Sequence, residues 1–372
     1  MTELNIITAL YGRAQGEAPA GMWLQGDQIK MMPGSRSTTV DGQDINSIWV
    51  EMQARLAAFN QFADAKAALL SFPVARETEK VGVPRNATFQ RASELGRPTK
   101  VRVEYVGRAF PLVHYDLAYG YSQEFLDYAT GAQITAVEAS VRSAWITLRR
   151  NIILAALFDD TNGTHEALTI RRLYNADGEV PPKFKRWTHS GSHTHYQVSA
   201  GASLADADIE TLEEHLIHHG FGEGDAQLVI HFNRAEYDDI AGLTNWVPAQ
   251  SADRPAIVLG TVLGTTPTAA RGLPVQGYIN RFSFVEDNDI PAGYLLAYAS
   301  GGVFAPENPV GVRYHENPSA RGLRLVQGPN GRYPLIDAVY DGYMGAGIRQ
   351  RGAAVCMQIT GGAYTVPTFD SP

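Results

Sequence analysis

The sequence predicts a mixed α+β fold built around one long helix. Residues 130–159 are amphipathic, because their apolar side chains recur at three- and four-residue steps and form one stripe. Thr130 and Gln133 have the spacing of a capping box, in which each side chain satisfies a free amide at the helix start. Segments on both sides of this helix have strand patterns. The stripe consists of Ile134, Val137, Val141, Trp145, Leu148, Ile152 and Ala155, while Glu138, Arg142 and Arg149 lie off it.

Composition excludes several classes of protein. The chain has 372 residues, which is enough for two domains with cores of their own. Its apolar runs are shorter than the ~20 residues needed to cross a bilayer, so we expect no membrane contact, and its start shows no signal segment. Cys356 is the only cysteine, so intrachain disulfides are impossible. The net charge of -8 argues against a general nucleic-acid binder.

Residues 1–46 have the composition of an arm. The segment 31–44 is rich in Gly, Ser, Thr and Asp and offers almost nothing to bury, so we expect neighbouring chains to order it. A helical period returns from Asn46 to Phe72, and this helix is expected to end before Pro73. Its apolar side is made of Ile48, Met52, Leu56, Phe59 and Phe62.

Residues 74–120 predict a long two-stranded excursion with a polar tip. Val101, Val103 and Tyr105 alternate with charged residues, as in a strand with one polar face. Eight basic and four acidic residues between 74 and 110 give this segment a charge of +4 on a chain of net charge -8. Such a hairpin can dock on an acidic surface of another copy. Charge alone equally allows a solvated hairpin without a partner.

The chain after the long helix alternates between strands and helices. Ser203 and Asp206 are expected to open one helix that closes at Gly220, and Asn233 and Glu236 a second that ends near Gly242. Residues 249–345 are rich in strands and in Gly and Pro turns. The expected strands are 168–175, 226–232, 291–302, 308–315 and 353–362, the last returning to the sheet beside the long helix, and 179–198 is expected to be a loop or hairpin.

Motifs for catalysis are missing from the sequence. It has no phosphate-binding loop, no dinucleotide fingerprint, no HExxH and no paired-cysteine zinc spacing. His189, His193 and His195 lie close enough in the sequence to bind a metal, and His215 and His219 are one helical turn apart, although histidine near a helix C-terminus is also favoured by the helix dipole. We expect no catalytic, cofactor-binding or metal-binding residue, and Cys356 is expected to be inert packing.

The order of these elements resembles that of the major capsid proteins of tailed bacteriophages, which have the Hong Kong 97-type fold. The stretches QLVIHFNRAEYDDIAGL (227–243) and VGRAFPLVHYDLAYGYSQEF (106–125) carry the resemblance together with the element order. The resemblance implies an N-terminal arm at 1–72, an extended β-hairpin loop at 73–120, a peripheral domain at 121–202 with the spine helix 130–159, an axial domain at 203–345, and a return to the peripheral domain at 346–372.

The resemblance also implies a function in assembly. Hexamers and pentamers of such a protein form the icosahedral head that encloses double-stranded DNA, and the protein is assembled in the cytoplasm of the bacterial host and ends in the virion. The expected partners are other copies, a separate scaffolding protein, a portal, a decoration protein and the DNA on the inner face. Intersubunit contacts are expected at Arg91, Arg97, Lys100 and Arg102 of the extended loop, and at Gly301 and Asn308 in the loops at the capsomer centre.

Two features limit the resemblance. Some family members join subunits through a lysine–asparagine isopeptide bond, but residues 346–372 contain no asparagine, so we expect no such cross-link here. We expect no removable scaffolding segment at the N-terminus, and any scaffolding protein is therefore expected to be separate. Two alternatives stay open at this point: an encapsulin-type nanocompartment shell, and a metal-dependent enzyme that uses the loop with His189, His193 and His195.

Overall fold

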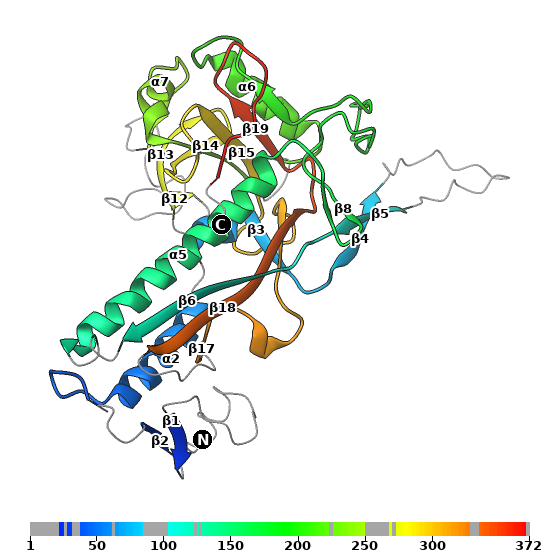
Figure 1. The fold of residues 1–372 in the computed structure, drawn as a ribbon. Helices are drawn as coiled ribbons and strands as arrows, with labels where there is room; N and C mark the ends of the chain where they lie inside the picture. The colour runs from blue at the N-terminus through cyan, green and yellow to red at the C-terminus, as the bar shows by residue number, and fades with distance from the viewer. Residues whose placement is uncertain are drawn as a thin grey trace. The chain divides into compact units, whose positions relative to one another are not determined.

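The fold is described from a computed structural model of the chain, drawn in Figure 1. Two compact units are present, and both receive residues from the long helix α5 (Gly131–Phe158) and from strand β18 (Leu335–Ile348). Unit 1 comprises Met1–Ala63, Val113–Thr147 and Tyr314–Met344, and unit 2 the rest. The residues that the structure describes are 22–25, 28–31, 38–61, 64–84, 103–122, 125, 128–222, 226–249, 268–269, 273–327 and 335–369.

Unit 1 packs two helices against a three-stranded ladder. β18 pairs antiparallel with β6 (Val113–Ser122) and with β17 (Arg324–Gln327). Helix α2 (Ile45–Gln61) buries Ile48, Met52 and Leu56 against the first half of α5 and this ladder, as the sequence period predicts. The unit also contains the hairpin of β1 (Met22–Gln25) and β2 (Gln28–Met31), and the 3-10 turn η3 (Pro318–Ala320).

Helix α5 begins with the predicted capping box. The Thr130 N–H donates to Gln133 Oε1 at 2.9 Å, and the Gln133 N–H donates to Thr130 Oγ1 at 3.4 Å. The predicted apolar stripe is correct for Ile134 and Val141, which are buried.

The stripe is wrong in two respects. Towards the C-terminal end, Ile153, Leu154 and Leu157 are buried, whereas Leu148, Ile152 and Ala155 are only half-buried, because a face drawn at fixed steps drifts around a 28-residue helix. Glu138, placed off the stripe, is buried: its carboxylate lies 3.5 Å from Arg55 and 3.3 Å from Arg142. Burial raises the pKa of Glu138 although both arginines act to lower it.

The second predicted helix is shorter than the sequence suggests. Helix α2 ends at Gln61, a separate short helix α3 covers Ala65–Leu70, and β3 (Ser71–Val74) follows it. Phe62 lies outside the described residues. The apolar run continues past the helix because β3 pairs parallel with β16 (Val310–Arg313), a tertiary contact that a helical period cannot reveal.

The core of unit 2 is a mixed sheet. Its strand order is β11-β13-β14-β10-β15-β19-β9, with β12 (Thr268–Ala269) paired to β13. The predicted strands at 226–232, 291–302 and 353–362 are confirmed as β10, β15 and β19. Their bounds and those of their neighbours are β9 Tyr196–Val198, β10 Gln227–Phe232, β11 Val247–Pro248, β13 Leu273–Ile279, β14 Phe282–Glu286, β15 Tyr294–Ser300 and β19 Ala354–Gln358.

Of the two helix starts predicted beside this sheet, one has a different cap and one is confirmed. In α6 (Asp206–Ile217), Asp208 rather than Ser203 makes the cap, because its carboxylate accepts from the Ala205 N–H at 2.9 Å. Asn233 does cap the turn η1 (Arg234–Glu236) that leads into α7 (Tyr237–Ala241), accepting from the Ala235 N–H. Leu212 and Leu216 of α6 are buried in the same core as β10 and β15.

Strand β19 lies in the sheet of β10 and β15, which brings the C-terminal segment against α5. The Cys356 S–H donates to the carbonyl of Leu157 in α5 at 3.4 Å, and burial raises the pKa of this thiol, which agrees with the predicted inert packing. The sheet thus joins β9, β15 and β19, one strand from each of three predicted domain segments. The predicted domain boundaries stay a prediction.

The structure describes the stem of the predicted extended hairpin. β4 (Thr78–Pro84) pairs antiparallel with β5 (Val103–Ala109), from Thr78 opposite Ala109 to Pro84 opposite Val103. Residues 85–102, which comprise the predicted tip and the start of the predicted second strand, lie outside the described residues. A second two-stranded hairpin, β7 (Gly163–His165) with β8 (Leu168–Ile170), lies beside β5 in Figure 1.

The strand predicted at 168–175 corresponds to β8, which is shorter than predicted. It ends at Ile170 because the next two side chains, Arg171 and Arg172, turn into ion pairs with Asp177 and Asp159. No helix among the described residues has the length and apolar character to cross a bilayer.

Candidate functional site

The loop residues predicted to contact neighbouring subunits cannot be placed. Arg91, Arg97, Lys100 and Arg102 all lie outside the described residues, so their intersubunit role stays a prediction. The stem that carries this tip is described, and its base is tied into unit 2 by a network of charged side chains.

Arg108, on β5, fixes one side of the hairpin base. Its guanidinium is buried and makes a forked ion pair with Glu179, with N–H groups at 3.2 and 2.6 Å from the two carboxylate oxygens. Glu79, on β4, accepts from Arg349 at 2.8 Å, and the Arg349 guanidinium lies 4.9 Å from the Phe72 ring centroid. Each strand of the stem is therefore held by an ion pair to a segment outside the hairpin.

Arg351 connects this base to the loop after β8. Its side chain is fully buried and donates to the carboxylates of Asp177 at 2.8 Å and Glu179 at 2.9 Å. Two further N–H groups donate to the carbonyls of Arg172 at 2.6 Å and Leu173 at 2.9 Å. The planar guanidinium also lies 4.4 Å from the ring centroid of Tyr174. Arginine suits this position because its fork of donors serves several acceptors in one plane.

The carboxylates of the network are held in the ionised form. Burial acts to raise the pKa of Asp177, but hydrogen bonds from Arg351 and Asn162 outweigh it and lower this pKa to about 2. The same competition lowers the pKa of Glu179, where Arg108 makes the stabilising bond. Burial raises the pKa of Tyr174 to about 12, so its ring stays neutral.

Asp177→Asn is expected to lower stability at neutral pH and to flatten its dependence on acid. The carboxyl has a pKa of about 2 in the folded chain and an ordinary value of 3.8. Its contribution, on the order of 2 kcal/mol, is complete above the ordinary pKa and is lost as the pH falls through the folded pKa. Urea denaturation at about pH 6 and about pH 2.5 measures this. If the wild type and the variant lost the same free energy of unfolding between these two pH values, the prediction would be wrong.

Gly301 and Asn308 belong to one loop between β15 and β16. Gly301 is exposed, whereas the Asn308 side chain is buried and bonded inside the chain. Its Nδ2 donates to the carbonyls of Ala68 at 3.1 Å, Ser71 at 2.9 Å and Gly302 at 2.9 Å. The side chain of Asn308 therefore holds its own loop, a role that the sequence did not indicate. Contacts of this loop at the capsomer centre stay a prediction.

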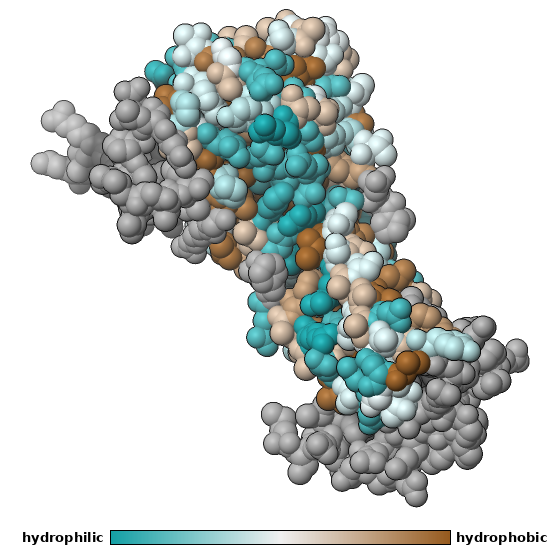
Figure 2. Space-filling view, turned by 90° about the vertical axis from the view of Figure 1, so that its left-hand side faces the viewer, coloured by the Kyte–Doolittle hydropathy of each residue, from teal (hydrophilic) through white to brown (hydrophobic). Residues whose placement is uncertain are grey.

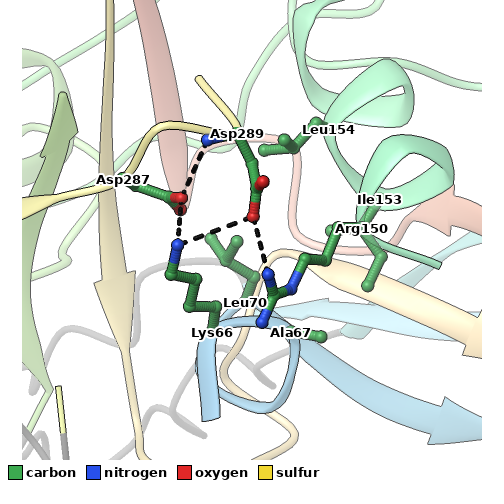
Figure 3. A pocket seen from close by; sticks show the side chains of 8 residues that line it. All are labelled: Lys66, Ala67, Leu70, Arg150, Ile153, Leu154, Asp287 and Asp289. Carbon is green, nitrogen blue, oxygen red and sulfur yellow. Dashed lines mark hydrogen bonds and ion pairs between the residues drawn. The ribbon is translucent and has the colours of Figure 1, made fainter. Parts of the chain in front are cut away.

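A second charged network fills a small pocket of unit 2 (Figure 3). Lys66 pairs with Asp287 and, at 3.5 Å, with Asp289, and Arg150 lies 2.9 Å from Asp289. His231 Nδ1 lies 2.9 Å from Asp287, and its Nε2 lies 2.9 Å from the Tyr298 hydroxyl. His231 and Tyr298 are fully buried, whereas the side chains of Lys66, Arg150 and Asp289 are partly exposed, so this chain of polar groups runs from the interior to the surface.

Histidines from two segments meet in unit 2. His189, His193 and His195, considered from the sequence as one group, lie against His215, His218 and His219 at the end of α6. The Nε2 atom of His219 is 3.0 Å from that of His193 and 2.8 Å from that of His195. The sequence marked the two groups separately, and His218 was missed.

Comparison with known proteins supports the assignment of the fold. No protein-family model and no curated protein matches the chain. Among solved structures, a chain from Mycobacterium phage Patience is 34% identical, with a TM-score of 0.68, and the match covers 90% of this chain and 93% of that chain. This chain belongs to the major capsid proteins of tailed bacteriophages, with the Hong Kong 97-type fold. As a major capsid protein it builds the icosahedral head.

Two more distant structures complete the comparison. A chain from the mature capsid of bacteriophage PhiM1 is 10% identical, with a TM-score of 0.48, and the match covers 80% of this chain and 87% of that one. A chain of the SrpI encapsulin complex from Synechococcus elongatus PCC 7942 is 11% identical, with a TM-score of 0.44, and the match covers 88% of this chain and 92% of that one. The relation to the phage Patience chain carries the assignment.

Proposed function

We propose that this major capsid protein assembles as hexamers and pentamers, and that the resulting head encloses the double-stranded DNA of a tailed bacteriophage. The observation that carries the proposal is the 34% identity to the phage Patience chain over nearly the whole length of both chains. The scaffolding protein, the portal, a decoration protein and the virion as final location belong to the same proposal.

The extended hairpin is the proposed intersubunit arm. A long arm can register a contact with a neighbouring subunit only if the direction of its base is fixed, and the ion pairs of Arg108 and Arg351 supply this constraint. The segment from 74 to 110 carries a charge of +4, while the whole chain carries -8, so an acidic surface of another copy is its complementary partner.

Exposed apolar residues in unit 1 also favour self-association. Val113 and Leu117 lie on one face of β6, and Tyr128 is 78% exposed. Of the described strands only β18 pairs with β6, and we propose the second edge of β6 as a place where a strand of another chain could pair. On the face drawn in Figure 2, an extended hydrophilic area is interspersed with small apolar groups. Interfaces of this kind add area to the hairpin contact.

Electron microscopy of negatively stained protein, together with light scattering, tests assembly. We expect rings of five and six copies and closed shells at high protein concentration. Arg108→Ala should reduce the yield of shells, whereas Arg281→Ala, at an exposed pair with Glu213, should leave it unchanged. A uniform species of one to four chains over a range of salt and pH would contradict the proposal. Particles from infected cells that contain enzyme cargo instead of DNA would support the encapsulin alternative.

A further inference from the structure

Six of the ten histidines of the chain gather between the loop 189–195 and the C-terminal end of α6. Four of them form a nearly regular tetrahedron of rings. All six centroid distances among these four rings lie between 4.5 and 5.0 Å. The four are His189, His193, His218 and His219.

This spacing is close to that of four imidazoles around one tetrahedral ion. With Zn–N bonds of about 2.0–2.1 Å and the radius of the ring added, ring centroids around zinc are separated by about 5 Å. One ligand nitrogen of each of the four histidines lies within 4.8 Å of the others, and the ligand nitrogens around a tetrahedral zinc ion are about 3.4 Å apart, so the rings must rotate or shift to reach a common centre. If the four rings only packed against one another, their nitrogen atoms would not need to converge.

Two of the four histidines have buried nitrogen atoms that lack a partner. The Nε2 atoms of His189 and His218 are inaccessible to solvent and make no hydrogen bond in the described part of the chain. The other ring nitrogen of His189 bonds to the backbone of His218, which leaves its Nε2 as the free ligand atom. Unsatisfied buried nitrogen atoms are rare in folded proteins, and a bound ion is one accepted reason for them.

Neutral imidazole is the form of histidine that binds metals, and the partial burial of all four rings favours this form.

We propose that His189, His193, His218 and His219 bind one zinc ion that fastens the loop 189–195 to helix α6. Imidazole nitrogens suit zinc, copper and nickel, and a tetrahedral set of four favours zinc. Four protein ligands leave no position open for a substrate, so the site is structural, unlike that of the metal-dependent enzyme considered above.

The neighbours of the site determine the tautomer of one of its ligands. The fully buried ring of His195 donates through Nδ1 to the carbonyl of Ala354 at 2.7 Å, so its Nε2 accepts the proton of the His219 Nε2, 2.8 Å away. Zinc binding therefore requires this contact to open or His219 to bind through Nδ1. The ring of Tyr174 stacks on His219 with a centroid distance of 5.7 Å, and its face also contacts Arg351. The zinc site is thus in contact with the network at the base of the extended hairpin.

Metal content and titration test the proposal on the full chain after any affinity tag is removed. Protein treated with EDTA and dialysed is titrated with zinc chloride by calorimetry, and bound metal is counted by mass spectrometry. We expect about one zinc ion per chain, a higher melting temperature with zinc, and the visible absorption of tetrahedral cobalt when cobalt(II) replaces zinc.

Matched variants separate this site from adventitious binding. His193→Gln and His218→Gln, singly and together, should weaken zinc binding by more than the roughly tenfold to hundredfold loss caused by removing an outer partner. His165→Gln, outside the cluster on β7, should bind zinc as the wild type does. If the wild type binds less than a tenth of an equivalent, or if His218→Gln and His165→Gln retain equal affinity, the proposal is wrong. Because the wild type is measured first, a variant that fails to fold does not decide the outcome.

Discussion

Arg351→Met is expected to lower the free energy of unfolding by about 3–5 kcal/mol, the cost of breaking a buried ion pair by removing one partner. Methionine keeps much of the length of the side chain but removes every donor. The carboxylates of Asp177 and Glu179 would lose a buried cation, and the carbonyls of Arg172 and Leu173 would lose their donors. Urea denaturation of unassembled protein, followed by circular dichroism, measures the loss.

Two further variants show whether the network or the charge is responsible. Arg351→Lys keeps the positive charge but cannot serve the four acceptors with one planar fork, so it should retain only part of the stability. Arg281→Met removes an exposed arginine whose pair with Glu213 spans 3.5 Å, and should cost less than about 1 kcal/mol. If Arg351→Met and Arg281→Met had similar effects, the buried network would not stabilise the hairpin base.

The same substitution should impair assembly more than stability alone explains. Arg351 and Arg108 both pair with Glu179. Loss of Arg351 therefore leaves Glu179, which holds Arg108 on β5, less firmly fixed. A hairpin whose direction varies would meet a neighbouring subunit in fewer productive orientations. Phe282→Leu, a core variant elsewhere in unit 2, serves as the reference. Urea is used to bring this variant and Arg351→Met to the same free energy of unfolding, and their shell yields are then compared. A lower yield for Arg351→Met at equal stability identifies the separate effect on assembly.

Local patterns were sufficient to predict the main elements. The capping residues Thr130 and Gln133 and the apolar steps of α5 depend only on neighbours along the chain, and the structure confirms both for the first half of the helix. Strand β10 is a continuous apolar run and was equally clear. The prediction failed where a tertiary contact overrode the local period, as at β3, which pairs with β16.

The candidate site could not be predicted in the same way. Arg108, Asp177 and Arg351 are far apart in the sequence, and a charged residue at each position is equally compatible with a solvated surface. The histidines gave a partial signal, since both segments were noticed. Their convergence depends on how the loop 189–195 packs on α6, which no spacing in the sequence encodes.

Asn308→Ala is expected to destabilise the unassembled chain by about 2–3 kcal/mol. The substitution removes the amide that donates to the carbonyls of Ala68, Ser71 and Gly302. The carbonyls of Ala68 and Gly302 keep the backbone N–H groups of Phe304 and Ala305 as donors, so only part of the cost of about 1–3 kcal/mol for each unsatisfied buried group applies to them. It also removes the acceptor of the Gly301 N–H, at 3.1 Å. Chemical denaturation below the assembly concentration measures the effect, with Asn317→Ala at the exposed start of η3 as the control, for which about 1 kcal/mol is expected.

This measurement also separates two roles for the loop between β15 and β16. If Asn308 acts inside the chain, the variant is destabilised before any assembly occurs, and the loss of shells follows from the loss of folded subunits. If its side chain instead contacts a neighbouring subunit, stability below the assembly concentration is unchanged and only shell formation suffers. The five hydrogen bonds to groups of its own chain, and full burial, favour the first result. Intersubunit contacts of this loop would then depend on exposed neighbours such as Gly301.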